Sequence, residues 1–167
     1  MVSFYLIQRP NNKGLYLTDM WCFSNQEMEI HHDYIQWMFP TDEKSRFVWN
    51  APVLSRATIG DMASNPQVIE NAYISAKRFL LFLGFYWGQR SLVRTDDWEK
   101  RSANWLAPNN HNFKRISRFL RFCSLMYMLD VRDALLHELN LLYNEHPEII
   151  GKETIEYWNA YGQGKTK

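Results

Sequence analysis

Residues 31–40 read HHDYIQWMFP, a segment that combines two imidazoles, a carboxylate, an amide and three aromatic rings and then ends at a proline. Its spacing predicts a helix in which one face is formed by Met28, His31, Ile35 and Met38. Two further pairs lie four residues apart, His32 with Gln36 and Asp33 with Trp37. Pro40 should end the helix, because the residue before a proline is disfavoured in the helical conformation. We therefore expect ligand-binding groups beside a core-facing stripe, although an ordinary amphipathic helix with a hydrogen-bonded histidine has the same pattern.

A second segment, residues 111–120 (HNFKRISRFL), also combines polar chemistry with an apolar helical face. His111, Arg115 and Arg118 share one side, and the opposite side carries Phe113, Ile116 and Leu120. Arginine presents a planar fork that can bind a carboxylate or phosphate through two hydrogen bonds. The same pattern fits a solvated basic face, or arginines that pair inside the fold with Asp33 or Glu29.

Both segments resemble the strongly marked parts of the opioid growth factor receptor family. Residues 32–40 look like the family's signature, and residues 111–120 resemble its other characteristic helix. Shorter similarities extend the resemblance over nearly the whole chain, at residues 4–5, 82–85, 98–105 and 155–158. The resemblance implies a non-catalytic, receptor-type domain that binds methionine-enkephalin, a pentapeptide of Tyr, two Gly, Phe and Met.

A small zwitterionic, aromatic peptide needs an apolar cleft, an acid for its amine and a guanidinium for its carboxylate. We expect Asp33 to bind the amine and Arg115 or Arg118 to bind the carboxylate. The ligand-binding residues expected from the residue chemistry and the resemblance are His32, Asp33, Tyr34, Gln36, Trp37, Trp98, Trp105, His111, Asn112, Arg115 and Arg118. This site requires the two segments to face one common recess, and it includes no metal, no cofactor and no catalytic residue.

Two other functions remain open from the residues alone. His32-Asp33 is similar to the His-Asp dyad of helical metal-dependent phosphohydrolases, and His111 would be a further member of such a site. However, His31 is at the wrong distance for the earlier ligand that these enzymes need. Alternatively, residues 71–129 hold ten Lys or Arg against three acids, which could attract a nucleic acid or a phosphate. The pI near 7.8 is low for a dedicated nucleic-acid domain.

The composition predicts a mainly α, compact single domain over residues 1–161, with six or seven helices and a short N-terminal strand at residues 4–7. Asn65-Pro66 should start a helix that ends at Gly84. Ser24 or Asn25 should cap the helix of the first segment, and Asp130 should cap a later one. Residues 41–57 read as a loop, residues 84–95 as a loop with room for a short extended piece, and residues 162–167 as a frayed polar tail.

The cysteines and the apolar runs of the sequence predict the cellular compartment of the protein. Cys22 and Cys123 are about a hundred residues apart and form no metal-binding pair, which favours a reducing compartment. Residues 1–10 do not read as a signal peptide, and the longest apolar run, residues 79–83, is far too short to cross a membrane. We therefore expect a cytoplasmic protein, or a nuclear one in a eukaryote, whose partner is a short peptide or a protein.

Overall fold

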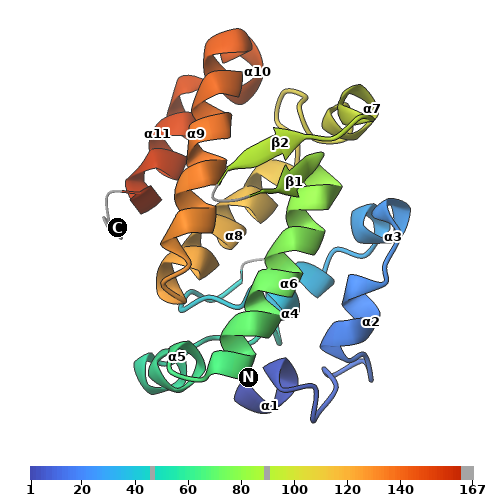
Figure 1. Ribbon diagram of the computed structural model, residues 1–167, viewed down its shortest axis with the longest axis vertical. Coiled ribbons are helices and arrows are strands. Elements are labelled where there is room, and N and C mark those ends of the chain that lie inside the picture. Colours follow the sequence, from blue (N-terminus) through green and yellow to red (C-terminus); the bar gives the residue numbers. More distant parts are fainter. Residues whose placement is uncertain (46–47, 89–90, 163–167) are drawn as a thin grey trace. The chain divides into compact units, whose positions relative to one another are not determined.

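The computed structural model describes residues 1–45, 48–88 and 91–162, and the chain divides into two compact units, Met1–Arg78 and Phe79–Lys167. The described residues form eleven helices and one two-stranded sheet, which confirms the predicted mainly α fold (Figure 1). There are more helices than the expected six or seven because several contain only four or five residues. In the predicted tail, Gly162 is the last residue of a helix, and residues 163–167 lie outside the described part.

The first unit contains short helices and the beginning of a long one. These are α1 (Val2–Tyr5), α2 (Leu17–Trp21), α3 (Asn25–Ile30), α4 (Tyr34–Met38), α5 (Arg56–Ala63) and α6 (Pro66–Leu83), which continues into the second unit. The strand predicted at residues 4–7 is wrong, because the chain is helical up to Tyr5. Tertiary contacts outweigh the β propensity of the aromatic residues there. The hydroxyl of Tyr5 donates to the carbonyl of Met38, and the Asn71 amide donates to the carbonyl of Tyr5 at 2.6 Å.

The first polar segment forms two helices rather than the one that its spacing predicts. Ser24 caps α3 as expected, because its hydroxyl accepts from the Glu27 backbone and the Glu27 carboxylate accepts from the Ser24 backbone at 2.7 Å. The helix then ends at His31, which has an extended conformation (φ −81°, ψ 103°), and α4 starts again at Tyr34. The three intervening residues therefore form a bend, and the predicted helical face is broken at His31.

The long helix α6 has the predicted ends. The Asn65 side chain accepts from the backbone of Gln67 at 3.0 Å and of Val68 at 3.3 Å, and Pro66 is the first helical residue. At the other end, Gly84 has φ +98°, and a Cβ atom there would lie 2.9 Å from Cε3 of Trp98. The loop predicted at residues 41–57 ends earlier than expected, because α5 begins at Arg56, and residues 46–47 of the predicted loop lie outside the described part. The helix α5 was not predicted, although the Ser55 hydroxyl caps it.

The second unit packs three long helices together and adds a small hairpin (Figure 1). Its elements are β1 (Phe85–Trp87), β2 (Leu92–Arg94), α7 (Trp98–Ser102), α8 (Asn112–Leu125), α9 (Leu129–Glu145), α10 (Pro147–Ile150) and α11 (Lys152–Gly162). The strands pair antiparallel with Tyr86 opposite Val93. The prediction that Asp130 caps α9 is wrong, because the helix begins one residue earlier and Asp130 lies in its first turn.

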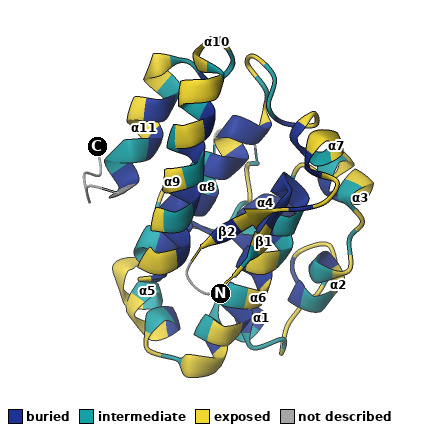
Figure 2. Cartoon of the chain, turned by 45° about the horizontal axis from the view of Figure 1, so that its top comes forward, coloured by how far each residue is buried: buried dark blue, intermediate teal, exposed yellow. Residues whose placement is uncertain are grey.

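The core of this unit is built on α8, which is largely buried (Figure 2). The Trp158 ring of α11 meets the Phe113 ring edge-on, and its indole nitrogen donates to the Ser117 hydroxyl at 2.9 Å. Between α9 and α11, the side-chain amides of Asn140 and Asn159 donate to each other at 2.8 and 2.9 Å. Among the described residues, no helix combines the length and the apolar content needed to span a bilayer.

Candidate functional site

The bend between α3 and α4 presents the first group of predicted site residues. His31 and His32 are exposed there, and the ring of His31 lies 5.3 Å from the ring of Phe23 between centroids. Asp33 is partly exposed and forms an ion pair with Lys13, in which Nζ and Oδ2 are 2.5 Å apart. The bend therefore places two imidazoles and a paired carboxylate at the surface of the first unit.

The remaining residues of this segment are more deeply buried. Tyr34 and Gln36 belong to the core, and the ring of Phe23 meets the ring of Tyr34 edge-on. With its amide nitrogen turned toward the bend, Gln36 donates to the carbonyl of Asp33 at 2.9 Å and to that of His32 at 3.1 Å. Trp37 is half-buried against Phe4, with 5.4 Å between ring centroids. Gln36 thus fixes the backbone of the bend, and Trp37 offers a partly accessible ring on the same short helix as Tyr34.

In the second unit, the start of α8 carries the other polar group. His111 precedes the helix and is exposed, whereas Asn112 is fully buried. Arg115 is only 4% exposed, and its guanidinium donates to the Asn112 side-chain oxygen at 2.9 Å. Arg118 is half-buried. The predicted polar face is therefore partly an internal network, in which Arg115 and Asn112 are bonded to each other.

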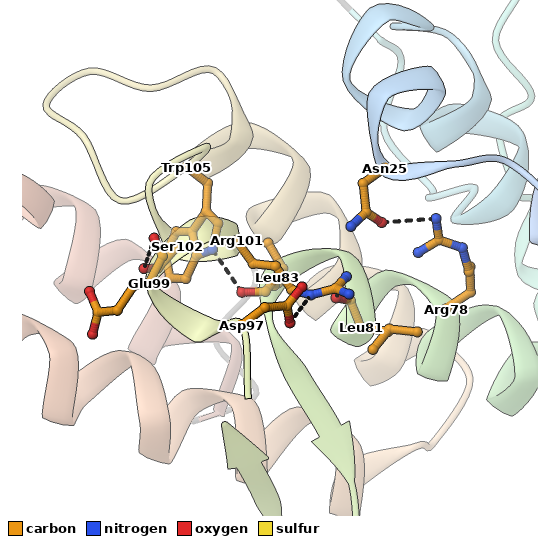
Figure 3. A network of polar contacts seen from close by, with 9 residues as sticks. All are labelled: Asn25, Arg78, Leu81, Leu83, Asp97, Glu99, Arg101, Ser102 and Trp105. Carbon is orange, nitrogen blue, oxygen red and sulfur yellow. Dashed lines mark hydrogen bonds and ion pairs between the residues drawn. The ribbon is translucent and has the colours of Figure 1, made fainter. Parts of the chain in front are cut away.

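Trp98 and Trp105 were expected among the ligand-binding residues, and the structure places both rings in the packed part of the second unit. Their ring centroids are 6.2 Å apart, and the Trp98 ring also contacts Phe85. The indole nitrogen of Trp105 donates to the carbonyl of Leu83 at 2.9 Å (Figure 3). This carbonyl belongs to the last turn of α6, where backbone acceptors have no partner within the helix.

A second side chain bonds the same helix end. The Arg101 guanidinium donates to the carbonyl of Leu81 at 2.9 Å and to the Asp97 carboxylate at 2.6 Å (Figure 3). The hydrogen bond from Arg101 holds the pKa of Asp97 below its ordinary value. A positive charge at the C-terminal end of a helix is favourable. Arg101 therefore attaches α7 to the end of α6 both by its hydrogen bond and by its charge.

Two features of the surface escaped the sequence analysis. One is Lys13, whose only signal was the turn-forming run Asn11-Asn12-Lys13-Gly14. The other is an open recess of about 360 Å³ in the second unit, and none of the predicted site residues lines it. Its lining residues are Ser91, Leu92, Asp130, Asp133, Ala134, His137 and Glu138.

The alternative function, a metal-dependent phosphohydrolase, requires several metal-binding side chains close together. Within residues 1–45, 48–88 and 91–162, no three His, Cys, Asp or Glu side chains lie together in a way that could hold a metal ion. The prediction that the two polar segments face one common recess stays a prediction, because the structure describes each unit by itself.

Comparison with known proteins points to one family. The conserved region of the opioid growth factor receptor family matches residues 2–162. The chain is 30% identical to the opioid growth factor receptor of Rattus norvegicus over 72% of the chain and 22% of that protein. It is 29% identical to the receptor of Homo sapiens over 67% of the chain and 17% of that protein. It is 26% identical to opioid growth factor receptor-like protein 1 of Mus musculus over 65% of the chain and 24% of that protein.

The matched region is thus no more than 24% of the length of any of these three relatives. No solved structure matches the chain.

Proposed function

Because this chain belongs to the opioid growth factor receptor family, we propose that it is a non-catalytic domain that binds a short, enkephalin-like peptide or a similar segment of a protein partner. The names of its relatives describe receptors for an opioid growth factor. This chain matches only a small part of the length of each relative. That this region by itself binds the peptide is our proposal.

The observation that carries the proposal is the arrangement around the bend in the first unit. A peptide amine needs a carboxylate, and Asp33 is a partly exposed carboxylate that already holds an alkylammonium group, that of Lys13, at 2.5 Å. An aromatic peptide side chain needs an apolar surface, and Trp37 lies half-buried against Phe4 only four residues from Asp33. We propose that Asp33 binds the amine and that Trp37 contacts an aromatic side chain of the peptide.

In the second unit, taken by itself, the exposed edge of α8 carries cationic groups of the kind that a carboxylate group needs. His111 and Lys114 are exposed at its start, and Arg118 is half-buried one turn further. Of the two arginines considered for this role, Arg118 is more accessible, because Arg115 is almost fully buried and donates to Asn112. We therefore propose Arg118 as the carboxylate-recognising residue of this edge.

The nucleic-acid alternative receives less support from the structure. It relies on the basic segment 71–129, but many of the arginines of this segment donate hydrogen bonds to acceptors of the protein itself. The guanidinium groups of Arg78, Arg94, Arg101 and Arg115 all donate to protein acceptors, and Arg121 is buried. No specific observation favours the metal-dependent phosphohydrolase over the binding domain.

The proposed location is intracellular, most simply the cytoplasm. Cys22 and Cys123 form no disulfide, as a reducing compartment would allow. Burial raises the pKa of the Cys123 thiol, so that this cysteine is kept as an unreactive apolar side chain.

Isothermal titration with the pentapeptide Tyr-Gly-Gly-Phe-Met tests the proposal directly. We expect saturable binding that weakens by about two- to fivefold in Asp33→Asn, because an ion pair with a partly exposed carboxylate contributes up to about 1 kcal/mol. Asp61→Asn, which removes an exposed carboxylate from α5, is the matched control and should bind like the wild type. Absence of heat and of any NMR shift at millimolar peptide would refute the proposal.

A separate titration tests Arg118 with N-acetyl-methionine, which carries only the carboxylate end of the peptide. We expect this compound to shift the side-chain NMR signal of Arg118, whereas the methyl ester should not. If the acid and its ester shift the signal equally, Arg118 does not recognise the carboxylate.

A further inference from the structure

The side chain of Lys13 lies where the amine of a bound peptide is expected. Its ammonium nitrogen is 2.5 Å from the Asp33 carboxylate, and the two side chains are 59% and 27% exposed. The pair is thus open to solvent, and an external ammonium group can reach the carboxylate by exchange with Lys13. A primary ammonium from a peptide has the same charge and the same hydrogen-bond donors as the lysine head group.

The backbone around Lys13 is held in a defined turn. The buried side-chain oxygen of Asn11 accepts from the backbone of Lys13 and of Leu15, each at 2.9 Å. The backbone of Asn11 donates to the carbonyl of Leu15 at 2.7 Å, and Gly14 turns the chain with φ +80°. The turn therefore keeps the lysine stem near the bend, which reduces the entropy lost when the ion pair forms.

The backbone that carries the Asp33 carboxylate is held as well. With its amide nitrogen turned toward the bend, Gln36 donates to the Asp33 carbonyl at 2.9 Å, and Gln36 is buried on α4. Both partners thus start from ordered backbone, and the flexible part of the contact is the lysine side chain. Lys13 can leave without disturbing the segment that carries Asp33.

We propose that Asp33 is a subsite for primary ammonium groups and that Lys13 is its internal occupant, which a ligand must displace. This inference rests on the proposed function for the identity of the natural ligand, but not for the chemistry of the subsite. The ligand class that this subsite accepts is peptides with an unblocked amino terminus. Lys13 lowers the affinity of Asp33 for any such ligand, so that ligands which bind weakly are excluded.

The first test compares Lys13→Gln with the wild type in titrations with Tyr-Gly-Gly-Phe-Met. Exposed ion pairs are weak, so we expect an affinity gain of about two- to fivefold when the competing ammonium is removed. The matched control is Lys77→Gln, which removes one exposed positive charge from α6 and should leave the affinity unchanged. The amino-terminally acetylated peptide should bind Lys13→Gln and the wild type with equal affinity, because it has no ammonium group to place at Asp33.

The outcomes separate this inference from the proposed function. If the wild type binds the peptide and Lys13→Gln binds it equally or more weakly, Lys13 does not compete and the inference is wrong, while the proposed function stands. If no variant binds the peptide, the proposed function fails and a second experiment decides the inference.

The second experiment uses n-butylammonium, which has the four carbons and the ammonium group of the lysine side chain from Cβ to Nζ. In Lys13→Ala, we expect this ion to shift the ¹³C carboxyl signal of Asp33 in a saturable way, and to do so more strongly than in the wild type. Tetramethylammonium, which has no N–H donor, should have a smaller effect. Equal shifts in Lys13→Ala and the wild type would overturn the inference.

Discussion

Tyr127 adopts a left-handed conformation (φ 56°) just after α8, at a position where glycine is usual. The backbone of Met128 donates to the carbonyl of Cys123 at 2.9 Å, and that of Tyr127 donates to the carbonyl of Ser124 at 3.4 Å, which is the Schellman pattern of a helix end. The Tyr127 side chain is 74% exposed, so it contributes little packing to offset the cost of a positive φ.

We expect Tyr127→Gly to raise the free energy of unfolding by up to about 1 kcal/mol, because glycine adopts this conformation without strain. Urea denaturation measures the change. Tyr127→Ala keeps a Cβ atom and should give no such gain. A loss of stability in the glycine variant would mean that the exposed ring makes a contact that the structure does not explain.

Trp105 illustrates the opposite case, a fully buried ring whose polar atom is satisfied. Trp105→Phe removes the donor to the carbonyl of Leu83 and leaves that carbonyl buried without this bond. We expect a loss of about 2 kcal/mol or more in the free energy of unfolding, from the unpaired acceptor and the lost volume. Trp49→Phe is the control, because Trp49 is fully exposed and its replacement should change stability by less than about 0.5 kcal/mol. Similar effects of the two substitutions would contradict the assigned role of Trp105.

At the scale of elements, the attachment of α7 to α6 depends on the Asp97 carboxylate. Its pKa is lowered in the folded protein, so ionised Asp97 stabilises the fold at neutral pH. This stabilisation is fully present above the pKa of the unfolded chain, about 4, and is lost as the pH falls through the lower folded value.

We therefore expect wild type to be more stable than Asp97→Asn at pH 7, with a difference that shrinks below about pH 4 and vanishes once Asp97 is protonated in both states. Thermal unfolding of both proteins between pH 7 and pH 3 measures this. A difference that stays constant with pH would exclude a contribution from the charge of Asp97.

Another pair of elements, α9 and α11, is joined by the reciprocal amides of Asn140 and Asn159. Each single alanine variant leaves the other amide without its partner, whereas the double variant removes both. We expect a double-mutant cycle to give a coupling of at least about 0.5 kcal/mol. Strict additivity of the two substitutions would show that the pair does not stabilise the packing of these helices.

The elements also show how far local sequence signals reach. Asn65, Pro66 and Gly84 act through the backbone of their own turn, and α6 was predicted with the correct ends. The break at His31 was not predicted, because Met28 and Ile35 keep helical spacing on both sides of it. The bend is associated with contacts from distant residues, the ion pair with Lys13 and the ring of Phe23, which a local pattern does not contain.

At the scale of the whole molecule, the family and the mainly α fold followed from the sequence, because both depend on long patterns that tolerate local error. The burial of the site residues did not follow. Arg115 and Arg118 have the same charge and lie one turn apart, yet only Arg118 keeps substantial exposure. Which arginine is bonded inside the protein depends on neighbouring side chains such as Asn112. The sequence therefore proposes the kinds of group for a binding site, and the structure ranks these side chains by their exposure.

The central claim is that Asp33 recognises the free amine of a peptide. A thermodynamic cycle tests it most directly, with wild type and Asp33→Asn each titrated with Tyr-Gly-Gly-Phe-Met and with its amino-terminally acetylated form. We predict that Asp33→Asn weakens binding of the free peptide by about two- to fivefold and leaves binding of the acetylated peptide nearly unchanged. Equal losses for both peptides would contradict the account, because Asp33 would then affect binding without contacting the amine.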